Sequence, residues 1–455
     1  MVPGGESDVL RPNHEDQIAE VFAEAAASGA TIGLRGAGRS YGDASLNTGG
    51  WLLDLTGLDR ILEFDAENGE VVVEPGVTIR DLWRRAIESH YWPAVVPGTM
   101  AVTCGGAAAM NIHGKNNFAV GSFGESVLEF DLLTPAGEKL VCNRSENSDV
   151  FHAAIGGFGM LGVFTRLRLK LKPVHSARMQ ITAVAIPDLQ AGLSYLEEHR
   201  LDADYLVGWL DLYARGSALG RGVFHHAKHP GPGEDPEGEK RFSATGQDLP
   251  SRLFYTIPKG WIWPGMWLFL HGGMWRFVNA AKYHAGVREA RRPSFMQPHA
   301  AFHFLLDYVP NWRSMTLPGG LIQFQPVVPA TEADRVFRTI IETCQRERLI
   351  PFLAVLKRHR SDPFLMTHAV DGFSLAMDFV IKKSTKARIW EMCDRLAETV
   401  LDAGGRFYYA KDTLLAPKCF ERIHGPAAVA EFKALKQRLD PEAILSTDLS
   451  RRLMT

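Results

Sequence analysis

The sequence has few cysteines and no excess of charge of either sign. Only five of its 455 residues are cysteines, and no two of them have the Cys-x-x-Cys spacing of a zinc or redox motif. Isolated cysteines favour reduced thiols in a reducing compartment over a disulfide framework. Lysine and arginine together number 50, against 52 for aspartate and glutamate, so the charge balance predicts no binding to nucleic acid.

Long hydrophobic runs are also missing. No stretch reaches the ~18 apolar residues that are needed to cross a bilayer, and the first residues lack the basic and apolar regions of a signal peptide. These absences predict a cytoplasmic protein, with at most a peripheral contact to the inner membrane. The segment Leu253–Leu270 is rich in aromatic residues but contains two prolines and two glycines. It is either a buried connection or a surface that faces lipid, and both interpretations remain open here.

The length and composition predict a soluble globular protein with more than one folding unit. The first predicted unit spans residues 1–176. Apolar residues at helical spacing predict a helix over His14–Ser28, and Thr78 can cap a second helix. The pair Asn68-Gly69 indicates a β-hairpin. The unit ends with Phe164–Pro173, a strand that alternates between apolar and basic residues.

The second predicted unit spans residues 177–405 and mixes strands with helices. The remaining tail, residues 406–455, is too short for a core of its own, so we expect it to dock on an earlier unit. The predicted strands of the second unit are Gln180–Ile186, Tyr205–Asp211, Gly320–Pro326 and Ser374–Ile381, and the predicted helices are Leu189–His199, Glu332–Arg346 and Lys386–Leu401.

Four glycine-rich segments lie in the first unit, at Leu34–Gly42, Pro97–Gly106, Asn111–Gly124 and Gly156–Gly162. Successive backbone N–H groups converge on an anion only where some residues adopt positive φ, and glycine does so without steric cost. Each segment taken alone is more often a tight turn between strands. Their clustering in one unit instead indicates a site for a long, phosphate-bearing cofactor held by the main chain.

The common nucleotide-binding motifs do not fit these segments. The glycines at 36, 38 and 42 have one residue too many for Gly-x-Gly-x-x-Gly, and turn-forming residues follow them in place of a helix. The pair Gly114-Lys115 lacks both the upstream glycine and the following Ser or Thr of a P-loop. We therefore expect loops, without the help of a helix terminus, to hold the phosphates.

Several of these segments resemble a known family. The segments that carry the resemblance are Arg35–Asp43, Pro97–Thr99, Cys104–Gly106, Asn111–Asn116 and Gly156–Gly159. They resemble the FAD-binding domain of the vanillyl-alcohol oxidase type and, within it, the decaprenylphosphoryl-β-D-ribose 2′-oxidases. The similarity covers nearly the whole chain, because it continues through Val309–Trp312, Gly319–Gln325, Phe352–Lys357, Tyr409–Asp412 and Ser446–Arg452.

The resemblance implies an α+β fold. A two-subdomain FAD-binding domain would be completed by the tail, and an α+β substrate domain with an antiparallel sheet would lie between. FAD would be extended, with its pyrophosphate on the loops Gly36–Gly42 and Gly105–Asn111 and its ring system toward the substrate domain. Many relatives tether FAD through a histidine in the first loop; this chain has Ser40 and Tyr41 there, which implies non-covalent FAD.

The residues that the resemblance assigns to the cofactor come from all four glycine-rich segments. They are Arg35, Gly36, Ala37, Gly38, Arg39, Ser40, Tyr41, Gly42, Pro97, Gly98, Thr99, Cys104, Gly105, Gly106, Ala109, Asn111, His113, Gly114, Lys115, Asn116, Gly121, Gly157, Gly159, Gly162 and Val163.

The resemblance places Lys411 near the flavin and the substrate, where a lysine can stabilise negative charge on reduced flavin and hydrogen-bond the reacting oxygen. Without the resemblance, a lysine followed by an aspartate is typical of a surface ion pair. Tyr408 and His113 complete the implied catalytic set. The implied substrate-binding residues are Trp209, Asn311, Gln323, Gln325, Lys357, Ser374 and Ala376.

The residues themselves bear on three of these substrate assignments. Gln323 and Gln325 alternate along one predicted strand, so both side chains face the same side. Ala376 stands where a family member has a cysteine, a change that leaves hydride transfer intact but removes a site for covalent inhibitors.

Three histidines, His225, His226 and His229, lie close together in the sequence. No cysteine or carboxylate accompanies them, so we predict no metal site.

Three functional hypotheses follow. The first is FAD-dependent oxidation of the 2′-hydroxyl of a polyprenyl-phosphoryl-β-D-ribofuranose to the 2′-keto sugar, with an NAD(P)H-dependent short-chain reductase as partner that completes the epimerisation to the arabinose form for arabinan and cell-wall synthesis. The second is oxidation of a soluble alditol or sugar lactone, with oxygen as acceptor. The third is a flavin-binding scaffold without turnover.

Overall fold

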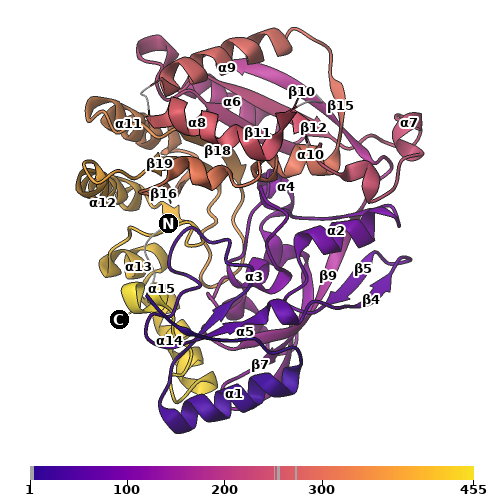
Figure 1. Cartoon of the computed structure of the whole chain (residues 1–455), viewed down its shortest axis with the longest axis vertical. Helices are drawn as coiled ribbons and strands as arrows, with labels where there is room; N and C mark the ends of the chain where they lie inside the picture. The colour runs from indigo at the N-terminus through magenta and orange to yellow at the C-terminus, as the bar shows by residue number, and fades with distance from the viewer. Residues whose placement is uncertain (1–4, 251, 254–256, 272–273, 455) are drawn as a thin grey trace.

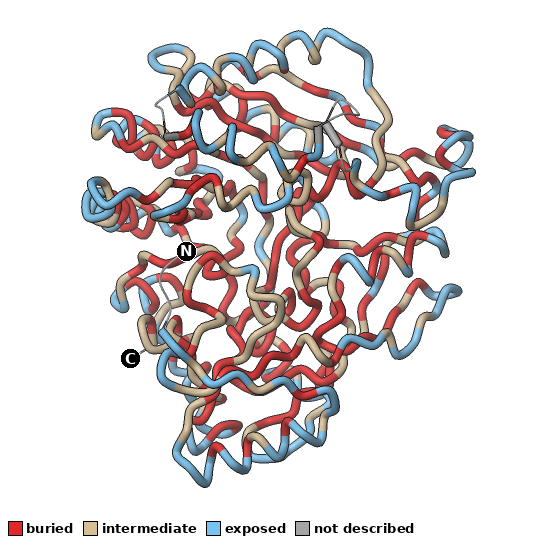
Figure 2. Tube along the Cα trace, viewed as in Figure 1, coloured by how far each residue is buried: buried red, intermediate tan, exposed pale blue. Residues whose placement is uncertain are grey.

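The computed structural model describes residues 5–250, 252–253, 257–271 and 274–454. Two large antiparallel β-sheets dominate these residues, the smaller in the lower half of Figure 1 and the larger in the upper half. Helices cover the outer faces of both halves. Figure 2 shows that the buried segments concentrate in the interior and that the exposed residues lie mainly on the outer helices and the loop tips. The predicted α+β fold class is confirmed.

A small parallel sheet opens the amino-terminal half. Its strands are β1 (Asp8–Leu10), β3 (Trp51–Asp54) and β2 (Ile32–Arg35), in that order. Helix α1 (Glu15–Ser28) forms where the helical spacing predicts it, because Ile18, Phe22 and Ala25 bury one face. It ends at Gly29, whose left-handed φ of 72° provides the cap.

The six-stranded sheet of this half has the strand order β4-β5-β9-β7-β8, with β6 paired to β9. The Asn68-Gly69 hairpin predicted from the sequence joins β4 to β5. Thr78 and Asp81 form a reciprocal capping box at the start of α2 (Ile79–Ile87), as Thr78 predicts. The strands are β4 (Ile61–Asp65), β5 (Glu70–Val73), β6 (Tyr91–Pro93), β7 (Val127–Leu133), β8 (Lys139–Asn143) and β9 (Val163–Pro173), and α5 (Ser148–Ala154) connects the last two.

One glycine-rich segment differs from the sequence-based expectation. The second half of Pro97–Gly106 is not a turn but the start of helix α3 (Cys104–Ala109), and the Thr103 side chain accepts a hydrogen bond from the Gly106 N–H. Three alanines follow the glycines, and alanine is the best helix former. A helix terminus therefore lies in this part of the chain. That loops alone hold the phosphates stays a prediction. Further along, α4 (Asn117–Val120) interrupts Asn111–Gly124.

The nine-stranded sheet forms the upper half, with the order β15-β10-β12-β11-β18-β19-β17-β20 and β16 paired to β19. All its pairings are antiparallel. The four predicted strands all occur in it. Its strands are β10 (Arg178–Ile186), β11 (Tyr205–Leu210), β12 (Gly222–Lys228), β15 (Phe295–Pro298), β16 (Leu321–Phe324), β17 (Pro326–Pro329), β18 (Leu353–His359), β19 (Gly372–Val380) and β20 (Arg406–Phe407).

Helices cover the two faces of this sheet. The helices predicted over Leu189–His199, Glu332–Arg346 and Lys386–Leu401 are present as α6 (Leu189–Glu198), α11 (Ala333–Arg346) and α12 (Lys386–Asp402). Glycines in two helices mark the close approaches: an added Cβ at Gly192 of α6 would lie 2.8 Å from the ring of Phe224, and one at Gly286 would lie 2.2 Å from Val223. Because Val223 and Phe224 are adjacent on β12, α6 and the Gly286 helix, α9 (Trp275–Glu289), pack on opposite faces.

The aromatic segment Leu253–Leu270 contains α8 (Ile262–His271), which runs through Pro264 and Gly265. Proline is tolerated there because it lies in the first turn of the helix. Trp261 is 78% exposed and Leu268 is 64% exposed. The interpretation of this segment as a buried connection is therefore wrong for the described residues. None of the helices among the residues described is both long enough and apolar enough to cross a membrane.

The carboxy-terminal segment begins in the large sheet and then returns to the amino-terminal half, where its helices appear in yellow in Figure 1. The main chain of Ile32 in β2 donates to Ile444 and accepts from Ser446. All five cysteines are free and buried. The helices of this segment are α13 (Pro417–His424), α14 (Pro426–Leu439) and α15 (Asp448–Leu453), and the remaining short elements elsewhere are α7 (Pro236–Glu239), α10 (His299–His303), β13 (Arg252–Leu253) and β14 (Ile257–Pro258).

Candidate active site

A large cavity lies between the two halves, with a volume of about 750 Å³. Glycine-rich segments of the amino-terminal half form one wall, and one face of the nine-stranded sheet forms another. Most of the residues that the sequence assigns to a cofactor line it. These are Arg35, Gly36, Ala37, Gly38, Arg39, Ser40, Tyr41, Pro97, Gly98, Thr99, Gly105, Gly106, Ala109, His113, Lys115, Gly159 and Gly162.

The glycines of the first wall are required by close packing. A Cβ added to Gly36 would lie 2.1 Å from Oγ1 of Thr103, and one added to Gly105 would lie 2.6 Å from the Pro75 side chain. Gly38 adopts a φ of 61°. The first loop and the start of α3 thus lie so close together that their main chains, not their side chains, form this part of the surface.

The sheet wall is built from side chains at alternate positions of neighbouring strands. Trp209 of β11 pairs with Val223 of β12 on one side and Val355 of β18 on the other. Val355 in turn pairs with Ala376 of β19. Residues two apart on a strand share a face. The lining of this wall consequently includes Val207, Trp209, Val223, His225, Gln323, Gln325, Leu353, Val355, Lys357, Ala376 and Asp378.

Lys411 lies where the two walls meet. Its Nζ is 3.4 Å from the centroid of the Tyr41 ring, so it contacts the first glycine-rich loop. Burial and the neighbouring Arg313 lower its pKa, while Asp378 opposes this shift. Burial likewise raises the pKa of Asp378, whose Oδ1 accepts a hydrogen bond of 2.5 Å from Nε2 of Gln323. The lysine and the aspartate thus form a buried pair whose two pKa values move toward each other.

His113 connects both walls. Nε2 of His113 accepts a hydrogen bond of 2.8 Å from the Gln325 amide, and Nζ of Lys357 lies 3.5 Å from Nδ1. Its ring lies 4.8 Å from that of Tyr408, measured between centroids. Burial and the nearby cation of Lys357 hold the pKa of His113 well below its usual range, so the ring is neutral near pH 7.

Three further lysines line the cavity with lowered pKa values, namely Lys115, Lys282 and Lys357. Lys115 donates a hydrogen bond to the Phe302 carbonyl, and burial lowers its pKa to about 7. Burial lowers the pKa of Lys357 to about 8. Because an anion that binds beside these groups would favour their charged forms, the cavity suits a negatively charged ligand.

Ten of the predicted site residues do not line the cavity. Some support the segments that do: Asn111 donates a hydrogen bond to Asp362 and accepts one from the Gly124 N–H. Ser374 is buried against His359, and Asn311 is exposed with a φ of 57°. The full set outside the lining is Gly42, Cys104, Asn111, Gly114, Asn116, Gly121, Gly157, Val163, Asn311 and Ser374.

Sequence reasoning missed several lining residues. Asp378 follows Ala376 at the spacing that shares a strand face, so the alternation already applied to Gln323 and Gln325 could have found it. The lining residues that come from the helices over the sheet show no sequence pattern that would place them in the cavity. Among them are Met266, Trp275, Asn279, Lys282, His303 and Trp312.

The three histidines considered for a metal site do not converge. His225 lines the cavity. His226 belongs to the other face of the same strand, since adjacent residues alternate. His229 lies against Tyr205, with ring centroids 5.4 Å apart.

Comparison with known proteins bears on the amino-terminal half and on the chain as a whole. Residues 7–143 match the family model of the FAD binding domain. The chain is 29% identical over 455 aligned residues to decaprenylphosphoryl-β-D-ribose oxidase of Mycolicibacterium smegmatis, which covers 98% of this chain and 94% of that protein.

Other relatives align over less of the chain. Cytokinin dehydrogenase 7 of Oryza sativa subsp. japonica is 30% identical over 185 residues, or 38% of this chain and 34% of that protein. L-gulonolactone oxidase of Bos taurus is 27% identical over 198 residues, or 43% of each.

The glycine-built wall fits FAD, because closely packed main chain leaves room for an extended cofactor and offers N–H groups to its phosphates. Together with the family match, it defines the chain as an FAD-dependent oxidoreductase, so the predicted cofactor and enzyme class are confirmed. Over nearly its whole length this flavoprotein resembles decaprenylphosphoryl-β-D-ribose oxidase.

Proposed function

We propose that this protein oxidises the 2′-hydroxyl of a polyprenyl-phosphoryl-β-D-ribofuranose to the 2′-keto sugar with non-covalently bound FAD. The observation that carries the proposal is the continuity of the cavity. It extends from the glycine-built wall, past Lys411, to an apolar surface on the outside of the molecule. A substrate with a sugar, a phosphate and an apolar chain matches that sequence of environments. The full-length similarity to decaprenylphosphoryl-β-D-ribose oxidase supports the same substrate class.

The apolar surface begins at the cavity itself. Leu305 lines the cavity and is 52% exposed, and Met266 of α8 and Trp275 of α9 also line it. Exposed apolar side chains continue outward on and near these helices. They are Trp261, Leu268, Phe269, Met274, Phe277, Leu305 and Leu317, which we call the apolar rim. An exposed apolar surface of this kind is typical of contact with a membrane or a lipid.

Bound FAD supplies the acceptor for the hydride of the carbinol carbon. The residues of the chain position the sugar and manage its proton. The Lys411–Asp378 pair can accept the hydroxyl proton, because burial lowers the pKa of the lysine and raises that of the aspartate toward neutral pH. Gln325 fixes the ring of His113 by donating its amide to Nε2, and this leaves the ring proton on Nδ1 beside the Gly114 carbonyl.

The cations of the cavity support an anionic substrate. Lys115 and Lys357 line the cavity together with Lys411, and Nζ of Lys282 lies 4.3 Å from the centroid of the Trp209 ring. A phosphodiester beside them would raise their lowered pKa values back toward the charged form. A neutral alditol gains nothing from these charges, and that disfavours the second candidate.

The remaining parts of the proposal concern the cellular setting. The 2′-keto product suits an NAD(P)H-dependent short-chain reductase, which would return it to an alcohol of the arabinose configuration. The apolar rim would hold the protein at the cytoplasmic surface of the inner membrane, where a polyprenyl substrate resides.

An alternative function, favoured by the similarity to L-gulonolactone oxidase, is oxidation of a soluble sugar lactone.

An anaerobic titration of the purified holoenzyme tests the proposal. We expect a polyprenyl-phosphoryl-β-D-ribofuranose to bleach the visible flavin band, and its 2-deoxyribose analogue, which lacks the reacting hydroxyl, to leave the band unchanged. An alditol and a sugar lactone are the competing substrates. Bleaching by a lactone but not by the lipid-linked ribose would replace the proposed function with the alternative.

A further inference from the structure

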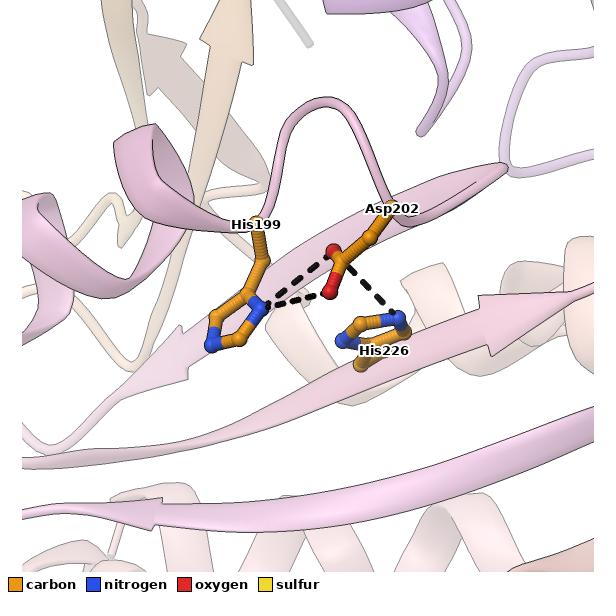
Figure 3. A group of neighbouring side chains, drawn as sticks. All are labelled: His199, Asp202 and His226. Atoms are coloured by element: carbon orange, nitrogen blue, oxygen red, sulfur yellow. Dashed lines mark hydrogen bonds and ion pairs between the residues drawn. The ribbon is translucent and has the colours of Figure 1, made fainter.

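A group of three polar side chains lies on the face of the nine-stranded sheet opposite the cavity. His199 follows the end of α6, Asp202 lies in the connection to β11, and His226 is on β12 (Figure 3). The neighbouring His225 lines the cavity, so His226 projects from the other side of the strand. The group is therefore separate from the site described above.

The three side chains converge on one point. Nδ1 of His199 lies 3.1 Å from Oδ2 and 3.2 Å from Oδ1 of Asp202. Nε2 of His226 lies 3.9 Å from Oδ1 of the same carboxylate. One ligand atom from each residue lies within 4.8 Å of the other two. Ligands of one zinc ion sit about 2 Å from the metal, so the three atoms must move slightly closer together to share an ion. The partly exposed side chains of His199 and Asp202 have room for this movement.

An ion pair between His199 and Asp202 accounts for only part of this arrangement. The side chain of His226 is 12% exposed, and its Nε2 is buried without a hydrogen-bond partner among the described residues. A buried polar atom of this kind calls for an explanation. At 3.9 Å, the approach to Asp202 is too long for a hydrogen bond but suits two ligands of a common ion.

The other ring nitrogen of His226 is already held. Its Nδ1 lies 3.1 Å from the Tyr195 hydroxyl, which can accept the Nδ1 proton and leave the Nε2 lone pair directed at Asp202. Metal-bound histidines commonly have such an outer partner, which fixes both the tautomer and the ring orientation. Burial lowers the pKa of His226, which favours the neutral ring that a metal requires. The neighbouring cations of Lys228 and His199 also lower the pKa of His226, whereas the carboxylate and main chain of Asp202 raise it. Lys228 lowers the pKa of Asp202 as well.

We propose that His199, Asp202 and His226 bind a divalent transition metal ion with imidazole and carboxylate ligands, for which Zn²⁺ is the natural probe. Three protein ligands leave at least one coordination position, and the exposure of Asp202 opens that position to water. The ion would link the end of α6 to β12 and so fasten the helix to the back of the sheet whose front lines the cavity. This inference does not depend on the identity of the oxidised substrate.

Titration calorimetry of Zn²⁺ into chelator-treated holoenzyme tests the proposal. We expect one ion per chain, and we expect His199→Ala and Asp202→Asn each to weaken binding by more than the ~10–100-fold that loss of an outer partner costs. Tyr195→Phe should weaken it within that range, since Tyr195 positions His226 without contacting the ion. His199 and Asp202 are partly exposed, so these substitutions leave the core intact.

A matched control is His284→Ala, which removes an exposed histidine of α9. It should leave Zn²⁺ binding unchanged, and an unchanged flavin spectrum in every variant verifies folding. If the parent protein binds Zn²⁺ no more tightly than His199→Ala, or if His284→Ala weakens binding equally, the three residues form only an ion-pair network and the proposal is wrong.

Discussion

The two walls of the cavity are built in opposite ways. On the amino-terminal side, glycines such as Gly36 and Gly105 bring main chain to the surface, and there is no space for a side chain between the packed segments. On the sheet side, alternate side chains of paired strands, such as Gln323 and Asp378, form the surface. The first wall presents N–H groups that recur at every residue, whereas the second presents a particular set of functional groups.

This difference has a practical meaning. A wall made of main chain tolerates the loss of nearby side chains but not the addition of a Cβ, and its ligand is one with repeated acceptor oxygens, such as a pyrophosphate. A wall made of side chains responds to truncation. Additions should therefore impair cofactor binding, and truncations on the other side should impair turnover with the cofactor in place.

The largest effect is expected from removing the charge of Lys411, which lies where the two walls meet. We expect Lys411→Met to lower kcat on the order of 10²–10³-fold, because a preorganised charge at the reacting oxygen is lost. FAD should remain bound, since the glycine wall is untouched. Steady-state turnover and the visible flavin spectrum measure the two effects separately.

Lys259→Met serves as the control for this substitution, because Lys259 is also buried but does not line the cavity. It should keep turnover close to that of the parent protein. Turnover of Lys411→Met within a few-fold of the parent would remove Lys411 from the proposed chemistry.

The opposite test adds one methyl group to the main-chain wall. A Cβ at position 36 would lie 2.1 Å from Oγ1 of Thr103, so the first loop and α3 must separate. Overpacking typically costs ~1–3 kcal/mol, and we expect Gly36→Ala to weaken FAD binding about 10–100-fold. Gly260→Ala, where no atom lies within 4 Å of the added Cβ, should bind FAD normally. Equal FAD affinity for both variants would contradict the main-chain account of this wall.

The third test concerns the apolar rim beyond the sheet wall. Replacing Trp261, Leu268 and Phe277 by serine should lower the partition of the protein onto phospholipid vesicles about tenfold or more, because each buried apolar side chain contributes to such binding. Flotation with vesicles measures the bound fraction.

A matched triple variant distinguishes position from hydrophobicity. Val9, Leu62 and Leu201 are also exposed apolar residues, but they lie on other parts of the molecule. Replacing these three by serine should leave vesicle binding unchanged. If both triple variants lose binding to the same extent, the apolar rim has no special role at a membrane.

The smallest expected effect is a dependence of stability on pH. Burial, reinforced by Arg406 and Lys357, lowers the pKa of His368 to about 3. The unfolded chain, with a histidine pKa near 6.5, therefore binds protons more readily than the folded chain as the pH falls from 6.5 toward 3. The contribution of this residue to stability is present above pH 6.5 and is lost below it.

Denaturant unfolding at pH 7.5, 6.5 and 5.5, read for the parent and for His368→Phe, measures this contribution. The free energy of unfolding of the parent should fall toward low pH more steeply than that of the variant, by at most about 1.4 kcal/mol per pH unit. Identical slopes would mean that His368 titrates alike in the folded and unfolded chains.

The same contrast explains how much of the fold and of the site can be predicted from the sequence. Glycine clusters are visible in a sequence because a close main-chain approach restricts the residue type, and this pattern predicts the segments that contain Gly36, Gly38 and Gly105. The resemblance to a family added Lys411 and Gln325. Individual strands and helices are predicted well because their signals lie close together in the sequence. Examples are the helical spacing of Ile18 and Phe22 and the capping pair Thr78 and Asp81.

Other features depend on contacts between distant segments, which no local pattern records. Lys282 and Trp275 join the lining only because α9 packs on β12. His199 and Asp202 meet His226 through the pairing of β11 with β12, whereas the sequence grouped His226 with its neighbours along the chain. The exposure of α8 was likewise undecided, because apolar composition is the same for a buried and a lipid-facing helix.

One contact of the carboxy-terminal helix α15 can form only late in the synthesis of the chain. Arg452 of α15 forms ion pairs with Asp43, beside the first glycine-rich loop, and with Asp412, beside Lys411. The ribosome makes the loop early and this arginine more than 400 residues later. The ion pairs that join this loop to the segment of Lys411 can therefore form only after translation has passed Arg452.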